Sequence, residues 1–394
     1  MVSNRAGVLG GVCETRRNKK NENQLDSCPS GTPIHAPIAL LQCDLMIAKF
    51  NLVLSMLIIP NSCFHVGIVG GGLAGINTAY HLIRQAPPPS SSLKITIIDP
   101  SPIGQGGATG VAGGILHPRN PRGTSDVYRG REGLESTKAI IREADEFAKR
   151  SSIISPALYK IDRADSSRSL VDGGIVVDVA AYLENLFSLL ASSNDLNLDR
   201  RLLTFDIDNV VASSELPFDA VVFAAGASCI ESDGRANAVR GQAIIFKPTS
   251  TNQPQLETPD ALIFGQYAIP QPKNRVMIGS TLEPFPDNVV PPLSSSEVIK
   301  ELYLKTAAHA PKVWNRELYE VEAITSAQRV QTYRSEKGRP PILKNLGGNS
   351  FLFTGLGSRG LLYGSIGGSI IAASVWESLK NPKQAKKQMS ELKW

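Results

Sequence analysis

The sequence predicts an α/β fold in which helices connect the strands of a parallel sheet. A short apolar strand at 65–70 leads through a glycine turn into a helical segment at 76–85, and a second strand follows at 94–99. Two further strands, in 218–227 and 350–354, end in small residues or glycines. Strands of a parallel sheet end in this way where their carboxyl ends approach a ligand.

The composition is that of a folded protein with room for two domains. The chain has 394 residues, of which 42% are apolar and 20% charged, and this excludes a disordered chain or a polytopic membrane protein. The net charge of +5 comes from the ends, because residues 1–63 and 378–394 together carry +6 and residues 64–377 carry −1. Nucleic-acid-binding proteins concentrate cations on the binding surface, so no nucleic-acid partner is expected.

Residues 1–63 differ from the rest and form a predicted N-terminal extension. Residues 1–37 are rich in Ser, Asn, Arg and Lys, and the apolar stretch Leu45–Pro60 follows. This stretch is shorter than the ~20 apolar residues of a membrane span, so a soluble protein without a stable span is expected. The basic residues favour a transit peptide for chloroplast or mitochondrion, with a cytoplasmic location or a mistaken gene start as alternatives.

Four of the five cysteines lie in this extension. None forms a Cys-x-x-Cys pair and no histidine lies at zinc-finger spacing, so neither a metal site nor a disulfide framework is predicted. The expected state of these thiols is reduced.

The segment from Gly70 to Gly75 has the G-x-G-x-x-G pattern between a strand and a helix, and a second strand with a terminal acid follows. Gly70 permits the tight turn, Gly72 lets a pyrophosphate approach the backbone, and Gly75 lets helix and strand pack closely. The start of the helix offers free N–H groups and a partial positive charge to phosphates. Asp99 ends the second strand, where its carboxylate can accept hydrogen bonds from a ribose. We therefore predict a Rossmann-like sheet that binds a dinucleotide.

The rest of the chain favours FAD over NAD as the dinucleotide. A second glycine-rich stretch stands at 100–118 in place of an ordinary crossover helix, and 355–361 forms a third before the last helix. Together with the strand ends in 65–70 and 218–227, these stretches spread over most of the chain beyond the extension. Such a spread implies a long ligand that extends across the sheet.

In these motifs the sequence resembles the FAD-dependent oxidoreductases of the D-amino-acid oxidase, glycine oxidase and sarcosine oxidase group. The motifs are GIVGGGLAG (67–75), ATGVAGGILHP (108–118), VVFAAGA (221–227), VRGQAII (239–245), YAIP (267–270), VMIGST (276–281) and GLGSRGLL (355–362). The resemblance implies an α+β architecture with a second, mainly antiparallel sheet in a substrate domain, and the short β-rich runs after residue 239 agree. The expected domains are a discontinuous FAD-binding domain (64–238 and 326–380), a substrate domain (239–325, with part of 119–172) and a basic tail (381–394).

The resemblance also indicates which residues contact FAD. Small residues would let the flavin ring lie flat beside 109–115, and the loop 355–361 opens a helix whose N–H groups stabilise negative charge on the reduced ring. Some relatives attach flavin through a cysteine in the C-terminal half, and no cysteine follows Cys229, so non-covalent FAD is expected. A simple turn at 113–114 and a loop salt bridge at Arg359 are the alternatives. The expected cofactor-binding residues are Gly70, Gly72, Leu73, Ala74, Gly75, Asp99, Thr109, Gly113, Gly114, Ile115, Gly226, Gly355, Gly357, Ser358, Arg359, Gly360 and Leu361.

Arg329 and Tyr267 are the expected substrate-binding residues. Arg329 matches the arginine of the family's R-x-x-T element, which binds the substrate carboxylate in relatives that oxidise glycine or D-amino acids. A planar guanidinium suits bidentate carboxylate binding better than a lysine does. The alternative for Arg329 is a salt bridge to Glu320 or Glu322, and the alternative for Tyr267 is a place in the core.

The resemblance implies oxidation of a C–N bond in an amino acid or an N-substituted, glycine-like amine. The neutral amine would expel a hydride from Cα to flavin N5, water would hydrolyse the imine, and oxygen or another acceptor would reoxidise the flavin. This step needs positioning and charge complementarity, so no catalytic acid or base is named. We expect His117 to begin a surface loop and His81 to be structural.

Other functions stay open. GLGSRGLL (355–362) also resembles the oxidase domain of a bacterial bifunctional enzyme that modifies the tRNA wobble uridine, although the charge of −1 over 64–377 disfavours a tRNA substrate. A flavoprotein scaffold or assembly factor without turnover is a second alternative, and it would not need Arg329 in a cavity. A nicotinamide-dependent dehydrogenase would explain neither 108–118 nor 355–362.

Overall fold

The fold is described by a computed structural model. It covers residues 63–87, 93–120, 123–162, 164–193, 195–200, 217–230, 234–249, 260–284, 291–381 and 390–394. The chain divides into two units, Met1–Pro60 and Asn61–Trp394, and every described residue belongs to the second. The predicted transit peptide and the apolar stretch Leu45–Pro60 lie outside the described residues. In the described part, no helix is long and apolar enough to cross a membrane.

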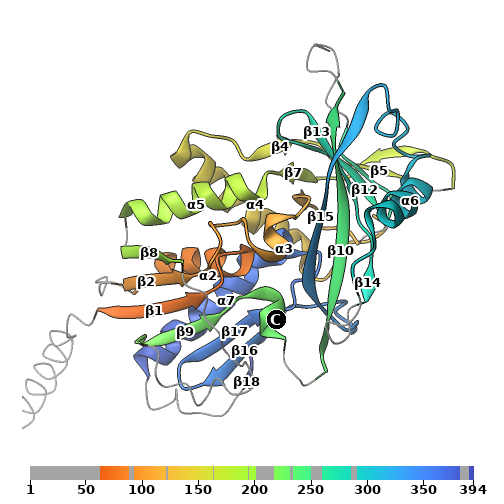
Figure 1. The fold of residues 1–394 in the computed structure, drawn as a ribbon. Helices are drawn as coiled ribbons and strands as arrows, with labels where there is room; N and C mark the ends of the chain where they lie inside the picture. Colours follow the sequence, from red (N-terminus) through yellow and green to blue (C-terminus); the bar gives the residue numbers. More distant parts are fainter. Residues whose placement is uncertain are drawn as a thin grey trace, which may run out of the picture. The chain divides into compact units, whose positions relative to one another are not determined.

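A seven-stranded sheet in the described part of the chain contains the predicted parallel strands (Figure 1). Its strand order is β18 (Ser390–Glu391), β16 (Ile342–Gly347), β17 (Ser350–Thr354), β9 (Ala220–Phe223), β1 (Phe64–Val69), β2 (Leu93–Ile98) and β8 (Asp195–Asp199). The run from β17 to β8 is parallel, whereas β16 and β18 pair antiparallel at one edge. The carboxyl ends of β1, β2, β9 and β17 therefore meet at the same edge, which confirms the predicted sheet.

Helices pack against one face of this sheet and share a single core with it. These helices are α2 (Leu73–Arg84), α4 (Gly130–Ala148), α5 (Val179–Ser193) and α7 (Gly360–Lys380). Helices α2 and α7 approach closely because α7 carries a glycine at the crossing: a Cβ on Gly368 would lie 2.8 Å from the carbonyl carbon of Asn77. The Trp376 indole N–H on α7 donates to the Leu82 carbonyl at 2.9 Å. This packing fixes the start of α2 relative to the start of α7.

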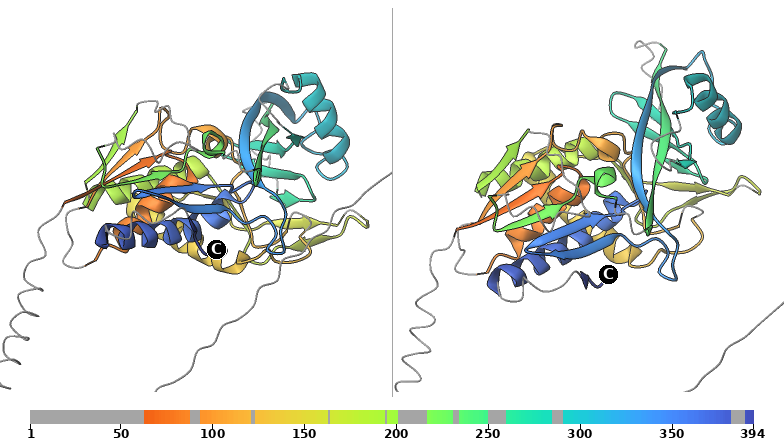
Figure 2. Two further views of the ribbon diagram at one scale, coloured as in Figure 1. Left: turned by 90° about the horizontal axis from the view of Figure 1, so that it is seen from below. Right: turned by 60° about the horizontal axis from the view of Figure 1, so that its bottom comes forward.

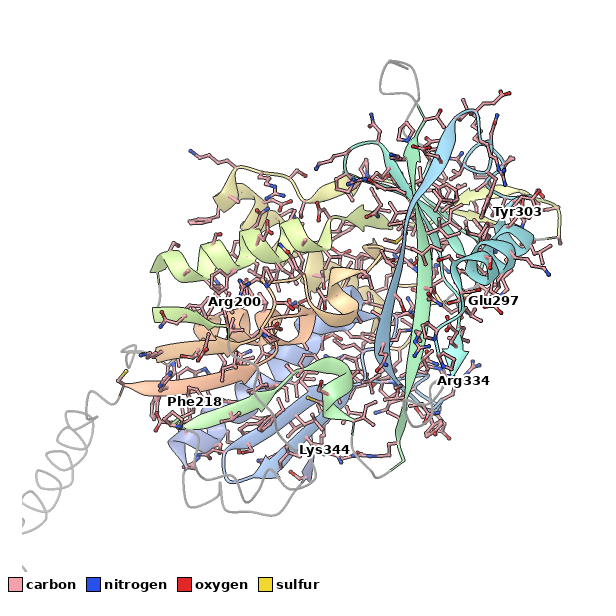
Figure 3. The ribbon with its side chains drawn as sticks, viewed as in Figure 1. Arg200, Phe218, Glu297, Tyr303, Arg334 and Lys344 are labelled. Atoms are coloured by element: carbon pink, nitrogen blue, oxygen red, sulfur yellow. The ribbon has the colours of Figure 1, made fainter. Side chains whose placement is uncertain are left out.

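Close packing also explains one glycine inside β1. A Cβ on Gly67 would lie 2.6 Å from the ring of Phe218. Figure 3 shows Phe218 at the start of β9, beside β1. The ring covers this part of β1, so the residue beneath it has no side chain.

The second sheet has eight strands in the described residues and is mainly antiparallel. Its order is β14 (Glu283–Pro284), β10 (Ala236–Pro248), β13 (Arg275–Gly279), β12 (Tyr267–Gln271), β11 (Leu262–Ile263), β5 (Tyr159–Ile161) and β6 (Arg168–Leu170), and β15 (Tyr319–Thr332) pairs with the other edge of β10. Helix α6 (Ser295–Thr306) packs on it through Val298 and Leu302. A smaller sheet contains β3 (Ile115–Leu116), β7 (Ile175–Val177) and β4 (Ile153–Ser155).

The long β10–β15 pair connects the two sheets. Figures 1 and 2 show it beside the carboxyl ends of β1, β9 and β17. The expected domain boundary at 325/326 falls within β15, which continues to Thr332, and β5 and β6 bring part of 119–172 into the second sheet. The side chains at the end of β15 therefore lie next to the glycine loops of the parallel sheet.

Candidate active site

A cavity of about 1580 Å³ lies at this junction. Small-molecule pockets measure roughly 300–1,000 Å³, so this cavity has room for a large cofactor together with a second molecule. All of the expected site residues except Gly75 line it. They are Gly70, Gly72, Leu73, Ala74, Asp99, Thr109, Gly113, Gly114, Ile115, Gly226, Tyr267, Arg329, Gly355, Gly357, Ser358, Arg359, Gly360 and Leu361.

The turn after β1 has the geometry of a phosphate cradle. Gly70 has a φ of 114°, and a Cβ there would lie 2.5 Å from the Ala224 carbonyl oxygen. A Cβ on Gly75 would lie 1.9 Å from the Gly70 carbonyl oxygen, so Gly75 is required for packing and does not reach the cavity. Gly72 caps α2 and no side chain bonds to the cap. Among the described residues, the first N–H groups of α2 are therefore available to an anion, apart from that of Leu73, which makes a long hydrogen bond to the Thr109 hydroxyl oxygen.

Asp99 braces this turn. Its Oδ2 accepts a hydrogen bond from the Gly71 N–H at 2.7 Å, and its Oδ1 accepts one from the Ser101 N–H at 2.8 Å. Each carboxylate oxygen has a second lone pair, so ribose binding by Asp99 stays a prediction. The bracing role was not anticipated from the sequence.

The stretch 109–115 runs between the two sheets. Thr109, in α3 (Gly107–Gly110), brings its hydroxyl oxygen to 3.4 Å from the Leu73 N–H nitrogen. A Cβ on Gly113 would lie 2.8 Å from Ile269 and 3.4 Å from the ring of Tyr267. Gly114 has a φ of 78° and backs onto β7. The small residues thus line the cavity from the glycine turn before α2 to strand β12 of the second sheet.

The loop after β17 enters α7 with two left-handed glycines, Gly355 (φ 76°) and Gly357 (φ 53°). The Gly357 N–H donates to the Val330 carbonyl at 2.8 Å, which joins this loop to β15. Arg359 caps α7, and its guanidinium donates only to the His117 carbonyl oxygen, at 3.4 Å, within the described residues. Burial lowers the pKa of Arg359. Arg359 forms no ion pair with a described residue, so the alternative of a loop salt bridge is not observed among those residues.

Arg329 lies on β15 and has no carboxylate partner among the described residues. Its Nε is buried and makes no hydrogen bond with any described residue. Glu320 pairs with Lys247 at 3.0 Å and Glu322 pairs with Arg275 at 2.5 Å, so neither expected salt-bridge partner contacts Arg329. Burial lowers the pKa of Arg329, partly offset by the Tyr267 hydroxyl. The unpaired guanidinium lines the cavity.

Tyr267 on β12 lies close enough to Arg329 to affect the pKa of its guanidinium. Its ring covers Gly279, where a Cβ would lie 2.4 Å from the hydroxyl oxygen, and the hydroxyl lies 3.8 Å from the sulfur of Met277. Burial raises the pKa of Tyr267 to about 12, so the hydroxyl stays protonated at neutral pH and can donate. Tyr267 is thus largely buried and also lines the cavity.

His117 differs from its expected place in a surface loop. The side chain is only 9% exposed and lines the cavity, and its Nδ1 has no partner in the described residues. Burial, followed by the charge of Arg359, lowers its pKa to about 3. His81, in contrast, bonds the Ser365 hydroxyl at 3.1 Å between α2 and α7, as expected of a structural residue.

One part of the cavity lining, the segment that follows the R-x-x-T element, was not predicted from the sequence. Arg334, Lys337 and Arg339 line the cavity, and Figure 3 shows Arg334 beyond the end of β15. Thr332 anchors this segment because its hydroxyl donates to the Pro340 carbonyl at 2.9 Å. The cluster of charges in YRSEKGR (333–339), directly after Arg329, was the available signal.

A family model described as FAD dependent oxidoreductase (DAO) matches residues 65–157 and 119–374. The chain belongs to this family. It is an FAD-dependent oxidoreductase, as its motifs indicated. No curated protein matches the chain significantly.

Solved structures of this family share the fold at low sequence identity. Glycine oxidase from Geobacillus kaustophilus is 19% identical (TM-score 0.60), and the match covers 80% of this chain and 95% of that chain. Iminodiacetate oxidase from Chelativorans sp. BNC1 is 17% identical (TM-score 0.60; 79% and 95% covered). L-proline dehydrogenase from P. horikoshii is 13% identical (TM-score 0.60; 80% and 94% covered). At these identities the likeness extends to the fold alone.

The residues present fit FAD. Gly70 and Gly72 line the cavity at the start of α2, and a glycine turn that leads into a helix suits a pyrophosphate. Gly113 and Gly114 line the cavity beside Tyr267 of the second sheet, and a wall without side chains suits a flat ring. The start of α7, with Arg359, adds positive charge at another wall of the same cavity.

Proposed function

We propose that this FAD-dependent oxidoreductase oxidises the C–N bond of an amino acid or an N-substituted, glycine-like amine, and that Arg329 binds the substrate carboxylate. The observation that carries the proposal is the buried, unpaired guanidinium of Arg329 beside the protonated hydroxyl of Tyr267. A buried charge without a partner is unfavourable, and a carboxylate that enters the cavity would compensate it. The planar guanidinium and the hydroxyl would donate to the same anion.

The side chains of the cavity would prepare the substrate. The guanidiniums of Arg329 and Arg359, which form no ion pair with a described residue, disfavour a further positive charge nearby, so the bound amine is kept neutral. Apolar walls at Ile115 and Leu361 would exclude water from the reacting carbon. FAD, bound non-covalently, would supply the two-electron acceptor, and the start of α7 would stabilise the negative charge of its reduced form.

The alternative of a scaffold without turnover accounts less well for Arg329. A protein that only holds FAD has no need for an uncompensated cation on the opposite wall of the cavity. Surface or paired arginines would serve folding equally well, as Arg275 does in its ion pair with Glu322.

Arg329→Lys tests the proposal. The substitution keeps the charge but loses the paired donors, so kcat/KM for amines that carry a carboxylate should fall about 30- to 1000-fold, while the matched amides should change much less. FAD content and Tm should stay near those of the wild type. Arg275→Lys, in an exposed ion pair of the same sheet, is the control and should have little effect on either substrate. Equal losses on acid and amide would falsify carboxylate binding by Arg329.

A further inference from the structure

His117 has a buried polar group that nothing in the described structure satisfies. The Nδ1 has no partner, and neither ring nitrogen makes a hydrogen bond with a described residue. Buried polar groups in native proteins are nearly always paired, because an unpaired group loses its hydrogen bonds to water without a replacement. The imidazole lines the cavity, so a molecule bound there is the natural partner.

The charge of the cavity shows which kind of partner fits. Among the described residues, its lining carries five cations, Arg329, Arg334, Lys337, Arg339 and Arg359, against three acids, Asp99, Asp126 and Glu336. Two of the acids are already engaged. Asp99 accepts two backbone N–H bonds, and Asp126 pairs with Arg119 at 3.2 Å and with Arg131 at 2.9 Å. The excess of positive charge favours an anionic ligand.

The anions assigned so far are placed at the start of α2 and at Arg329, and none of them is assigned to Arg359. In the proposed function the substrate carboxylate is bound by Arg329, which leaves Arg359 beside His117 without a counter-charge from the described residues. The pyrophosphate of FAD is placed at the start of α2, and the oxidised flavin ring, which is present when substrate binds, is uncharged. A second anionic oxygen near Arg359 would supply this counter-charge.

The neutral imidazole is suited to bind that oxygen. Burial and the Arg359 charge both disfavour protonation, and a neutral ring carries one N–H donor and one acceptor. A donor next to a guanidinium attracts the same oxyanion that the guanidinium attracts.

We propose that His117 binds a second acidic group of the substrate, so that the amine oxidised by this protein carries two carboxylates. This inference rests on the proposed function, in which Arg329 takes the first carboxylate. His117 is then a specificity-determining residue that contacts the substrate and not the flavin.

The test compares two ethers that have no amine to oxidise. Methoxyacetate has one carboxylate, and diglycolate has the same ether with a second carboxylate. Dissociation constants are measured for the FAD-loaded full-length protein from the change in flavin absorbance. The side chains of His117→Phe and His117→Leu cannot form hydrogen bonds. They differ in shape, so if one variant fails to fold, the other can still be measured. His117→Gln restores a donor, and His309→Phe, whose ring stacks on Phe264 at 4.8 Å outside the cavity, is the control.

The wild type should bind diglycolate more tightly than methoxyacetate. Loss of a hydrogen bond to a charged group should weaken diglycolate about 10- to 100-fold in the Phe and Leu variants and methoxyacetate less than about 3-fold. His117→Gln should recover part of the loss, and His309→Phe should bind both ligands as the wild type does. Equal losses for the two ligands, no loss at all, or a changed FAD content or flavin spectrum would overturn the inference.

Arg329→Lys separates this inference from the proposed function. If that variant weakens both ethers while the His117 variants show no selectivity, only the second carboxylate is refuted. If Arg329→Lys weakens neither ether, carboxylate binding by Arg329 fails, and the inference fails with it.

Discussion

Gly72 and Thr109 lie against each other at the start of α2. A Cβ on Gly72 would lie 2.8 Å from the Thr109 hydroxyl oxygen. The packing of α3 against the turn therefore favours a glycine at residue 72, and the predicted approach of a phosphate would be a second constraint. The sequence predicted only the approach of a phosphate, because the packing depends on where α3 lies in space.

Gly72→Val should abolish FAD binding, because a branched side chain would block the phosphate site. The measurement is the FAD-to-protein ratio after purification. Thr109→Ala removes the hydroxyl that a new Cβ would meet, so the double variant Gly72→Ala/Thr109→Ala tests the packing constraint. If phosphate approach is decisive, the double variant should bind FAD as poorly as Gly72→Ala alone. Full recovery in the double variant, or stoichiometric FAD in Gly72→Val, contradicts the phosphate-turn assignment.

The sequence indicated single residues well where a motif fixes the backbone. Gly70, Gly75 and Gly114 occupy turns or contacts that no larger residue would fit, and each belongs to a motif with known spacing. His117 was misjudged because its environment comes from α7, more than 200 residues later in the chain, through Arg359. Such long-range packing leaves no local pattern in the sequence.

At the scale of elements, α2 and α7 share a buried polar cluster. The His81 ring on α2 bonds the Ser365 hydroxyl, which in turn lies 2.6 Å from the Ser136 hydroxyl on α4. Burial lowers the pKa of His81 to about 4. Because the folded state holds this imidazole neutral, the unfolded state binds more protons as the pH falls.

The stability contributed by neutral His81 should be present above pH ~6.5 and lost between there and about pH 4. The free energy of unfolding should drop by about 2 kcal/mol between pH 7.5 and pH 5 from this residue alone. Urea unfolding of the wild type and His81→Gln at both pH values, with FAD in excess, measures the difference. The variant should lose less stability on acidification than the wild type. An unchanged pH dependence in His81→Gln would show that His81 does not cause the loss.

The elements followed from the sequence to differing degrees. Strands β1, β2, β9 and β17 and helices α2 and α7 had clear periodicity or glycine boundaries, and they lie where predicted. The length of β15 could not be predicted from the sequence, because its residues from Tyr319 to Thr332 show no regular alternation of exposed and buried positions. Its pairing with β10 therefore depends on contacts across the sheet rather than on its own pattern.

At the scale of the whole molecule, the glycine loops of one sheet and the side chains of the other form a single cavity. The order of the sequence motifs predicted that these loops and side chains meet, but it did not predict the cationic segment 333–339.

The purified protein should be yellow, because the cavity fits FAD. It should release FAD on acid or heat treatment, because no cysteine follows Cys229 in the chain. Chromatography of the supernatant identifies the released cofactor. Bound NAD, or flavin that stays on the denatured chain, would contradict non-covalent FAD.

Anaerobic reduction of the bound flavin is the direct test of whether this protein oxidises amines that carry a carboxylate. The FAD-loaded protein is mixed without oxygen with glycine, N-methylglycine, iminodiacetate and other amino acids, and in parallel with the matched amides, and the flavin absorbance is followed. We expect at least one amine that carries a carboxylate to bleach the flavin, and its amide to do so far more slowly. Arg329→Lys should remove this difference between acid and amide. A flavin that stays oxidised with every amine while FAD remains fully bound would contradict amine oxidation, and it would support a scaffold without turnover.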